Sequence, residues 1–322
     1  GNLKMNKNNL NGYSGIPIEF LNTLYMNKYP HIFFLIIPSI VFGIWSCRTE
    51  VQQAFPRYKQ TPVINAVFTA DSTMWVHMSF AQSMGNEPIT TIPNAQVLVF
   101  CQNSCIDTLT HSGNGMYVSD SIARQGMQYT IRAIVPNYDT ITATQVIPYT
   151  SHVVRSEFIP IVTHNSEGHV SGFDVTIQTT PQQLSYFMIT CFGYSYGNYR
   201  KISTSFSEDD PSFIHEGIPS GVISNALYLN DSSFTVRLVY QQGKYYDQYQ
   251  RYQIQLYHIS KDFYEYMQSS YLYEKNRYPE FSFNGITPYN LYSNTSNNHG
   301  VFMSSAVSIT DTIRIYNNPS LF

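Results

Sequence analysis

The carboxylates best placed for chemistry in this sequence form one acidic cluster. Glu208, Asp209 and Asp210 follow one another shortly before His215 and Glu216. Oxygen ligands in this number suit Ca²⁺, which several carboxylate and carbonyl oxygens bind together. The spacing differs from that of a helix–loop–helix calcium loop, and a solvated acidic turn is the commoner reason for such a run. Glu208, Asp209 and Asp210 therefore stay candidate ligands only, and we expect no metal and no other cofactor.

Two further pairs of metal-ligating residue types lie close together in the sequence. His164 and His169 flank a glycine but lack the spacing and the cysteine partners of a zinc site. Cys101 and Cys105 follow the apolar residues 97–100, which predicts the tip of a hairpin with a three-residue loop. Two thiols facing each other across that hairpin could form a disulfide in an oxidising compartment, and two reduced thiols at a turn are the alternative. Cys191 is expected to be a small buried apolar residue.

Catalytic motifs give no support for an enzyme. The sequence contains no nucleophile elbow of a hydrolase, no zinc-protease helix motif, no phosphate-binding loop and no glycine-rich nucleotide turn. We therefore expect no catalytic residues, and a hydrolase is kept only as the least favoured alternative. The formal net charge is −3, without a clustered basic segment, which argues against a nucleic-acid partner.

Tyrosine is the residue type that most strongly suggests a binding surface. Five tyrosines cluster in two segments expected to contain loops: Tyr194, Tyr196, Tyr199, Tyr245 and Tyr246. Exposed aromatic side chains often mark interaction surfaces because they bury a large area at low entropic cost. Ordinary packing on a sheet explains alternating tyrosines as well, so both interpretations stay open for this candidate interaction surface.

The elements that would position these side chains are strands. Charged residues make up only 12% of the chain, about half the usual share, and the 27 Tyr and 20 Phe suit pleated sheets. Apolar residues alternate with others in short runs between turn residues, as at Met74, Val76 and Met78. We predict an all-β fold with two antiparallel β-sandwich domains, residues 61–148 and 149–322.

One helix is expected in the second domain, at about residues 260–277. Ser260 can cap its first turn and Asp262 sits favourably there. Pro279 ends it. An apolar stripe along the helix consists of Phe263, Met267 and Tyr271.

The N-terminal region indicates export. Residues 32–45 are uncharged and apolar, lie shortly after Lys28, and end just before Cys47. This is the pattern of a secretory signal peptide, and a cysteine after it resembles a bacterial lipoprotein signal. We predict an upstream extension at residues 1–25, a signal peptide at 26–46, lipidation at Cys47 and a linker at 47–60. A transmembrane anchor is the alternative, but the run is shorter than the about 20 residues required, and Pro38 interrupts it.

Residues of the first domain resemble a known sandwich. Segments 92–97, 113–117, 126–133 and 136–138 are similar to transthyretin-like, carboxypeptidase-regulatory-like modules. The resemblance implies a β-sandwich and assigns no activity.

Residues of the second domain carry a more specific resemblance. Segments 256–266, 292–295 and 298–302 resemble the C-terminal signature of a lipoprotein family known as domain of unknown function number 4249. Asn298 and His299 depart from its pattern. The family consists of outer-membrane lipoproteins of Gram-negative bacteria, often encoded beside TonB-dependent receptors. The resemblance implies a lipid-anchored accessory protein, on either leaflet of the outer membrane, with a receptor barrel as its partner. A structural or assembly lipoprotein of another outer-membrane complex is the alternative.

Overall fold

The structure is a computed structural model, and it describes residues 60–82, 88–166, 168–195, 197–207, 221–241, 251–277 and 289–314. Backbone contacts divide the chain into Gly1–Arg57 and Tyr58–Phe322, and all described residues belong to the second unit. The predicted extension, signal peptide and lipidation site at Cys47 lie outside the described residues. So do Glu208, Asp209 and Asp210.

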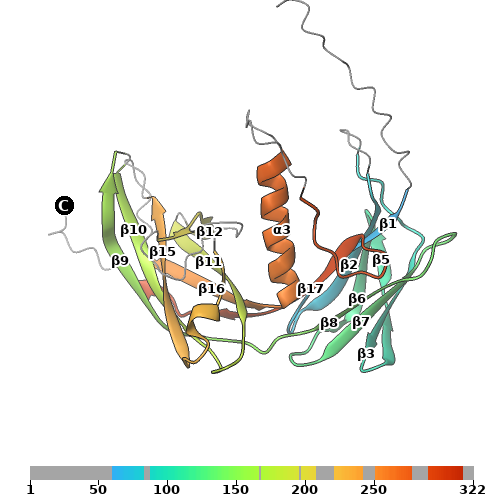
Figure 1. Ribbon diagram of the computed structural model, residues 1–322, viewed down its shortest axis with the longest axis horizontal. Helices are drawn as coiled ribbons and strands as arrows, with labels where there is room; N and C mark the ends of the chain where they lie inside the picture. The colour runs from blue at the N-terminus through green and yellow to red at the C-terminus, as the bar shows by residue number, and fades with distance from the viewer. Residues whose placement is uncertain are drawn as a thin grey trace, which may run out of the picture. The chain divides into compact units, whose positions relative to one another are not determined.

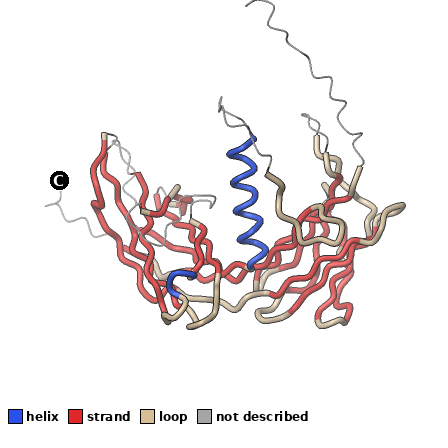
Figure 2. The backbone as a smooth tube through the Cα atoms, viewed as in Figure 1, coloured by secondary structure: helices blue, strands red, loops and turns tan. Residues whose placement is uncertain are grey.

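Strands make up most of the described chain (Figure 2). The first group of strands comprises β1 (Pro62–Thr69), β2 (Thr73–Phe80), β3 (Gln96–Cys101), β4 (Ser104–Thr108), β5 (Thr110–Gly113), β6 (Met116–Ile122), β7 (Gln128–Ile134) and β8 (Ile141–Val146). Alternation decides which side chains are buried: Ile64, Ala66 and Phe68 are fully buried, whereas the residues between them are half-buried. Met74 and Val76 of β2 are buried in the same way, as their spacing predicts.

The first sandwich forms because two sheets bury these alternating faces against each other. Strands β1, β2, β6 and β5 lie in order at one end of a large sheet, and β4-β3-β7-β8 form a separate four-stranded sheet. Phe68 of β1 meets Tyr129 of β7 edge to face, with ring centroids 5.9 Å apart. Buried side chains from both sheets share one core. Area removed from water stabilises such a core by about 25 cal/mol per Å².

The second sandwich also consists of two sheets that bury their alternating faces against each other, and several of its strands are longer. Its elements are β9 (Val153–Asn165), β10 (Gly168–Gln178), β11 (Tyr186–Ser195), β12 (Asn198–Ile202), β13 (Ser205–Phe206), β14 (Val222–Ser224), the 3₁₀ turn η1 (Ala226–Tyr228), β15 (Ser233–Gln241), β16 (Arg251–Ile259) and β18 (Ile313–Arg314). A four-stranded sheet of β13-β15-β10-β9 packs against β11 and β16. Phe173 and Tyr252 meet edge to face with ring centroids 5.0 Å apart, and the Tyr252 hydroxyl lies 2.6 Å from that of Tyr240. Cys191 is fully buried here, as predicted.

Strand β17 (Gly300–Ile309) joins the two sandwiches through one ten-stranded sheet, β12-β11-β16-β17-β1-β2-β6-β5 with β14 and β18 at its side. It pairs antiparallel with β16 and parallel with β1, beside which Figure 1 shows it. Phe302 of β17 therefore packs in the first core, with its ring centroid 4.7 Å from that of Phe68. At Gly300, φ is +98°, and a Cβ would lie 2.0 Å from the carbonyl oxygen of Ile64, so the close approach requires glycine.

The predicted all-β class, with antiparallel sandwiches and a helix in the second part, is confirmed. The parallel pairing of β1 with β17 is the departure from a purely antiparallel fold. The domain boundary after residue 148 falls between β8 and β9, and it stays a prediction, because β17 packs into the first core and also pairs with β16 of the second sandwich.

Helix α3 (Lys261–Arg277) begins where the capping pattern predicts. The backbone N–H of Phe263 donates to Ser260 Oγ at 3.3 Å, which satisfies one of the free donors of the first turn. The predicted apolar stripe is only half-buried; the most buried helical residue is Ser269, whose Oγ accepts from the backbone N–H of Tyr292 at 2.9 Å. No helix in the described part of the chain is long and apolar enough to cross a membrane.

The hairpin at Cys101 differs from the prediction. Its loop is a two-residue turn at Gln102 and Asn103, both with positive φ, rather than a three-residue loop. Cys101 pairs with Ser104 and Cys105 pairs with Phe100, so the two cysteines are not opposite each other. Cys105 follows Ser104, the partner of Cys101, so the two cysteine side chains point to opposite faces of the sheet. Both thiols are free in the structure, and the disulfide stays a prediction.

Candidate functional site

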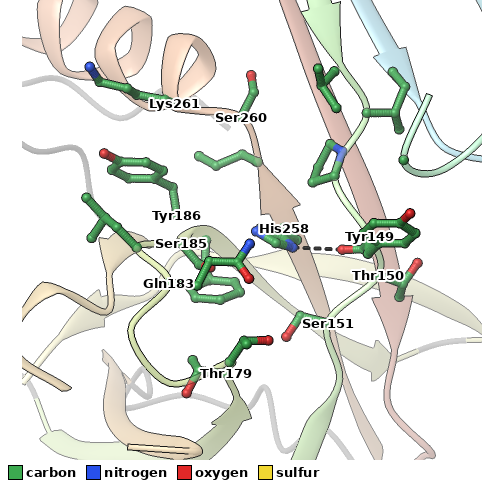
Figure 3. A pocket seen from close by; sticks show the side chains of 18 of the residues that line it. Tyr149, Thr150, Ser151, Thr179, Gln183, Ser185, Tyr186, His258, Ser260 and Lys261 are labelled. Carbon is green, nitrogen blue, oxygen red and sulfur yellow. Dashed lines mark hydrogen bonds between the residues drawn. The ribbon is translucent and has the colours of Figure 1, made fainter. Parts of the chain in front are cut away.

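A cavity of about 890 Å³ lies where the segment that follows β8 passes the end of β16 and the start of α3 (Figure 3). Its walls also include the loop between β10 and β11. Rings line it at Tyr149, His152, Tyr186, Phe187 and His258. Hydroxyl and amide side chains line it at Gln128, Thr144, Gln145, Thr150, Ser151, Gln178, Thr179, Thr180, Gln183, Ser185 and Ser260.

His258 is the central side chain of this cavity in Figure 3. It comes from β16 and its Nδ1 lies 2.7 Å from the carbonyl oxygen of Tyr149. Because a carbonyl only accepts, Nδ1 carries the hydrogen, and Nε2 of the neutral ring is an acceptor. Burial lowers the pKa of His258 below its ordinary value, against the opposing effect of the Tyr149 carbonyl. The ring of Phe187 lies 5.1 Å away, centroid to centroid.

Hydrogen bonds between side chains and backbone hold the end of β8 and the segment after it along the cavity. The carbonyl of Val146, the last residue of β8, accepts from Ser304 Oγ at 2.8 Å, and the backbone N–H of Thr150 donates to Gln125 Oε1 at 3.0 Å. The ring of Tyr149 lies over Gly126, where a Cβ would come within 2.4 Å of the tyrosine oxygen. Tyr149 is nevertheless 71% exposed, so one edge of the cavity is an accessible aromatic ring.

The opposite wall is braced by one buried amide. Asn225 is fully buried and its Oδ1 accepts from the backbone N–H of Ser185 at 2.8 Å. Its Nδ2 donates to the carbonyl of Gln183 at 3.0 Å. These bonds fix the backbone that presents Gln183, whose side-chain amide points toward His258 in Figure 3. A rigid scaffold of this kind presents a preformed surface to a ligand.

Charged groups at the cavity are paired within the protein. Lys261 Nζ lies 3.2 Å from Glu265 Oε1 in a helical ion pair. Asp262 Oδ2 accepts from Gln145 Nε2 at 2.5 Å, and Asp262 Oδ1 accepts from the hydroxyl of Tyr292. The groups that remain for a ligand are neutral hydroxyls, amides and rings.

This arrangement can bind a ligand through rings, hydroxyls and amides. The bond from His258 Nδ1 to a backbone carbonyl orients the imidazole and leaves Nε2 as an acceptor. Within the described ranges, no three His, Cys, Asp or Glu side chains gather closely enough to hold a metal ion.

The structure brings together two of the five tyrosines predicted as an interaction surface. Tyr194 and Tyr199 face each other across β11 and β12, with ring centroids 5.2 Å apart. The guanidinium of Arg251 lies 5.4 Å from the centroid of the Tyr194 ring. Neither tyrosine lines the cavity, and Tyr196, Tyr245 and Tyr246 lie outside the described residues.

Sequence patterns gave little sign of the cavity. In the sequence, residues 147–151 span the predicted domain boundary, and His258 lies within the family signature at 256–266. The residues that line the cavity come from segments as far apart as Gly126 and Asp262, each of which has an ordinary local pattern. Pairing of β16 with β11 and β17 brings these segments together.

Comparisons with known proteins place the chain in a family. No curated protein matches it in sequence. A solved structure that resembles it in part is that of a protein from Corynebacterium diphtheriae described as membrane anchored, with 7% identity and a TM-score of 0.21. That likeness covers 63% of this chain and 55% of the other, and at this TM-score it carries no argument. The model of the family "Domain of unknown function (DUF4249)" matches residues 48–310. The narrower resemblance to transthyretin-like modules stays a prediction, whereas the family match covers both sandwiches and the helix, and the chain therefore belongs to the DUF4249 family.

Proposed function

We propose that this protein is a lipid-anchored accessory protein of the outer membrane, which binds a ligand for a TonB-dependent uptake receptor and catalyses no reaction. The observation that carries the binding role is the cavity beside His258, whose available groups are neutral hydroxyls, amides and rings. The resemblance to family members encoded beside such receptors supports the choice of partner. The lipoprotein pattern that ends at Cys47 supports the anchor.

The chemistry of the cavity favours an uncharged ligand rich in hydroxyl groups. An ionic ligand would need a partner of opposite charge inside the site, but the Lys261 and Asp262 side chains are already engaged. Hydroxyl and amide side chains both donate and accept hydrogen bonds, as a polyhydroxylated molecule does. The exposed ring of Tyr149 offers an apolar face for the carbon side of such a molecule. Small saccharides and their glycosides meet these requirements.

Ligand binding is tested by titrating neutral oligosaccharides into the full chain, with isothermal calorimetry as the measurement. Tyr149→Ala removes the exposed ring, and Gln183→Ala removes an amide that points into the cavity. Both variants are expected to bind at least about tenfold more weakly, equivalent to about 1.4 kcal/mol. Tyr289→Ala, at a ring that is 44% exposed and does not line the cavity, is the matched control. Equal affinity in all four proteins would remove the cavity from the proposal.

The partner and the anchor are tested separately. Purification from membranes in mild detergent is expected to recover a receptor barrel with the protein. Recovery without any barrel would favour the structural or assembly lipoprotein. Labelling with palmitate is expected to disappear in Cys47→Ala, and persistent labelling would contradict that lipidation site.

A further inference from the structure

The hairpin of β9 and β10 brings two imidazoles into direct contact. His164 and His169 are cross-strand partners, and both are exposed. Their Nδ1 atoms lie 2.8 Å apart, with ring centroids 4.6 Å apart and the planes inclined at 73°. The spacing of the two histidines in the sequence does not by itself indicate this contact. Neither residue belongs to the cavity beside His258.

The strands around the pair hold it in register. β10 pairs with β9 on one side and with β15 on the other. The buried Ser171, two positions beyond His169, donates from Oγ to the carbonyl of Pro160 at 2.7 Å, which ties β10 to β9. Gln241 Nε2 donates to the carbonyl of His169 at 3.4 Å from the β15 side. The two imidazoles therefore project from a backbone that is bonded on both sides of β10.

We infer that His164 and His169 form a two-nitrogen site for a divalent transition metal of the Cu²⁺ or Ni²⁺ type. Imidazole nitrogen is a preferred ligand of these ions, with metal–nitrogen bonds of about 2.0 Å. Two such bonds to nitrogens 2.8 Å apart enclose an angle of about 90°, which is the angle between adjacent positions of a square-planar or octahedral ion. Tetrahedral Zn²⁺ would need the nitrogens about 3.3 Å apart, so the geometry disfavours it.

Both imidazoles of the pair are accessible to an ion from solvent. Two protein ligands leave the remaining positions of the ion open to water or to donors from another molecule. Because both imidazoles are exposed, an ion can reach them without opening the sandwich. The site is independent of the proposed uptake role, since neither side chain contributes to the cavity.

A hydrogen bond between one protonated and one bare Nδ1 would give the same distance without any metal. Calorimetric titration of the tag-free full chain with Ni²⁺ separates the two explanations. Ni²⁺ is the first probe because the exposed thiol of Cys105 can reduce Cu²⁺. We expect one ion per chain at this site, bound more tightly than Zn²⁺. His164→Asn and His169→Asn are each expected to weaken Ni²⁺ binding at least about tenfold, while asparagine keeps the exposed strands polar.

His111→Asn is the matched control, since it removes an exposed imidazole from β5 and leaves the pair intact. Far-ultraviolet circular dichroism checks that every variant is folded. Electron paramagnetic resonance of Cu²⁺ in a Cys105→Ser background should show coupling to two nitrogens, reduced in each single variant of the pair. Equal Ni²⁺ affinity in the original chain and in the double variant would overturn the inference, and so would a spectrum unchanged by loss of either imidazole.

Discussion

The Nδ1 hydrogen of His258 is donated to the carbonyl of Tyr149 across 2.7 Å, and this bond ties β16 to the segment that follows β8. The two residues are far apart in the chain, yet together they form the centre and the edge of the cavity. The neutral imidazole, favoured by burial, thus helps to hold the wall of a binding site.

This bond leads to a pH dependence of stability. The folded-state pKa of His258 lies below the ordinary 6.5. Well above pH 6.5 the ring is therefore neutral in both the folded and the unfolded state, and its full contribution to the free energy of unfolding is present. As the pH falls below 6.5, the unfolded chain binds the proton first, and the free energy of unfolding decreases until the folded-state pKa is passed. His258→Asn keeps an N–H donor for Tyr149 but does not titrate. Urea unfolding at pH about 8 and about 5 should therefore show a smaller difference in this variant than in the original chain.

Gly300→Ala should weaken the parallel pairing of β17 with β1. The added Cβ would lie 2.0 Å from the Ile64 carbonyl oxygen. The alanine would also have to adopt the positive φ of this position, which is unfavourable for any residue with a Cβ. We expect the free energy of unfolding to fall by about 3 kcal/mol or more in urea denaturation. Gly113→Ala is the control, because it has φ +111° but nothing within 4 Å of a Cβ. If both variants lose the same stability, backbone strain alone explains the loss and the close approach is unimportant.

Ser260→Ala should remove the cap of α3. Ser260 Oγ accepts from the backbone N–H groups of Phe263 and Ser304, each at 3.3 Å. Loss of such a cap lowers the free energy of unfolding by about 1 kcal/mol. Ser260→Thr keeps the hydroxyl and should stay within about 0.5 kcal/mol of the original chain. Chemical denaturation followed by circular dichroism measures both, and an alanine variant as stable as the threonine variant would argue against the cap.

The three described cysteines should differ in reactivity toward iodoacetamide. Cys105 is exposed and should be alkylated in the native protein, whereas Cys191 is fully buried and burial raises the pKa of its thiol to about 12. Cys191 should therefore react only after denaturation, as peptide mass spectrometry can show. Blocked Cys101 and Cys105 that become reactive only after a reductant is added would instead indicate the disulfide between them.

Local patterns were sufficient for much of the fold. Tyr129, Ile131 and Ala133 are buried on one face of β7, as their alternation predicts, because each side chain of a strand points opposite to its neighbours. Ser260 and Asp262 likewise indicated the start of α3, since capping depends only on residues within one turn. These predictions needed no knowledge of distant segments.

Long-range pairing decided what local patterns left open. No spacing around Gly300 indicates that β17 lies parallel to β1, and no spacing of Cys101 and Cys105 shows the two-residue turn that pairs Cys101 with Ser104. The contact of His164 with His169 also depended on the register of one hairpin, because a shift by one residue would place the rings on opposite faces.

The sequence by itself determined the strand-rich class, the position of the helix and the family, because periodicity, caps and signature residues act over short stretches of chain. Only the tertiary structure decided that β17 packs into the first core while pairing with β16 of the second sandwich, and that Tyr149, Gln183 and His258 surround one cavity. The physical reason is that hydrogen bonds and packing between distant strands choose among many pairings that alternating sequences allow equally.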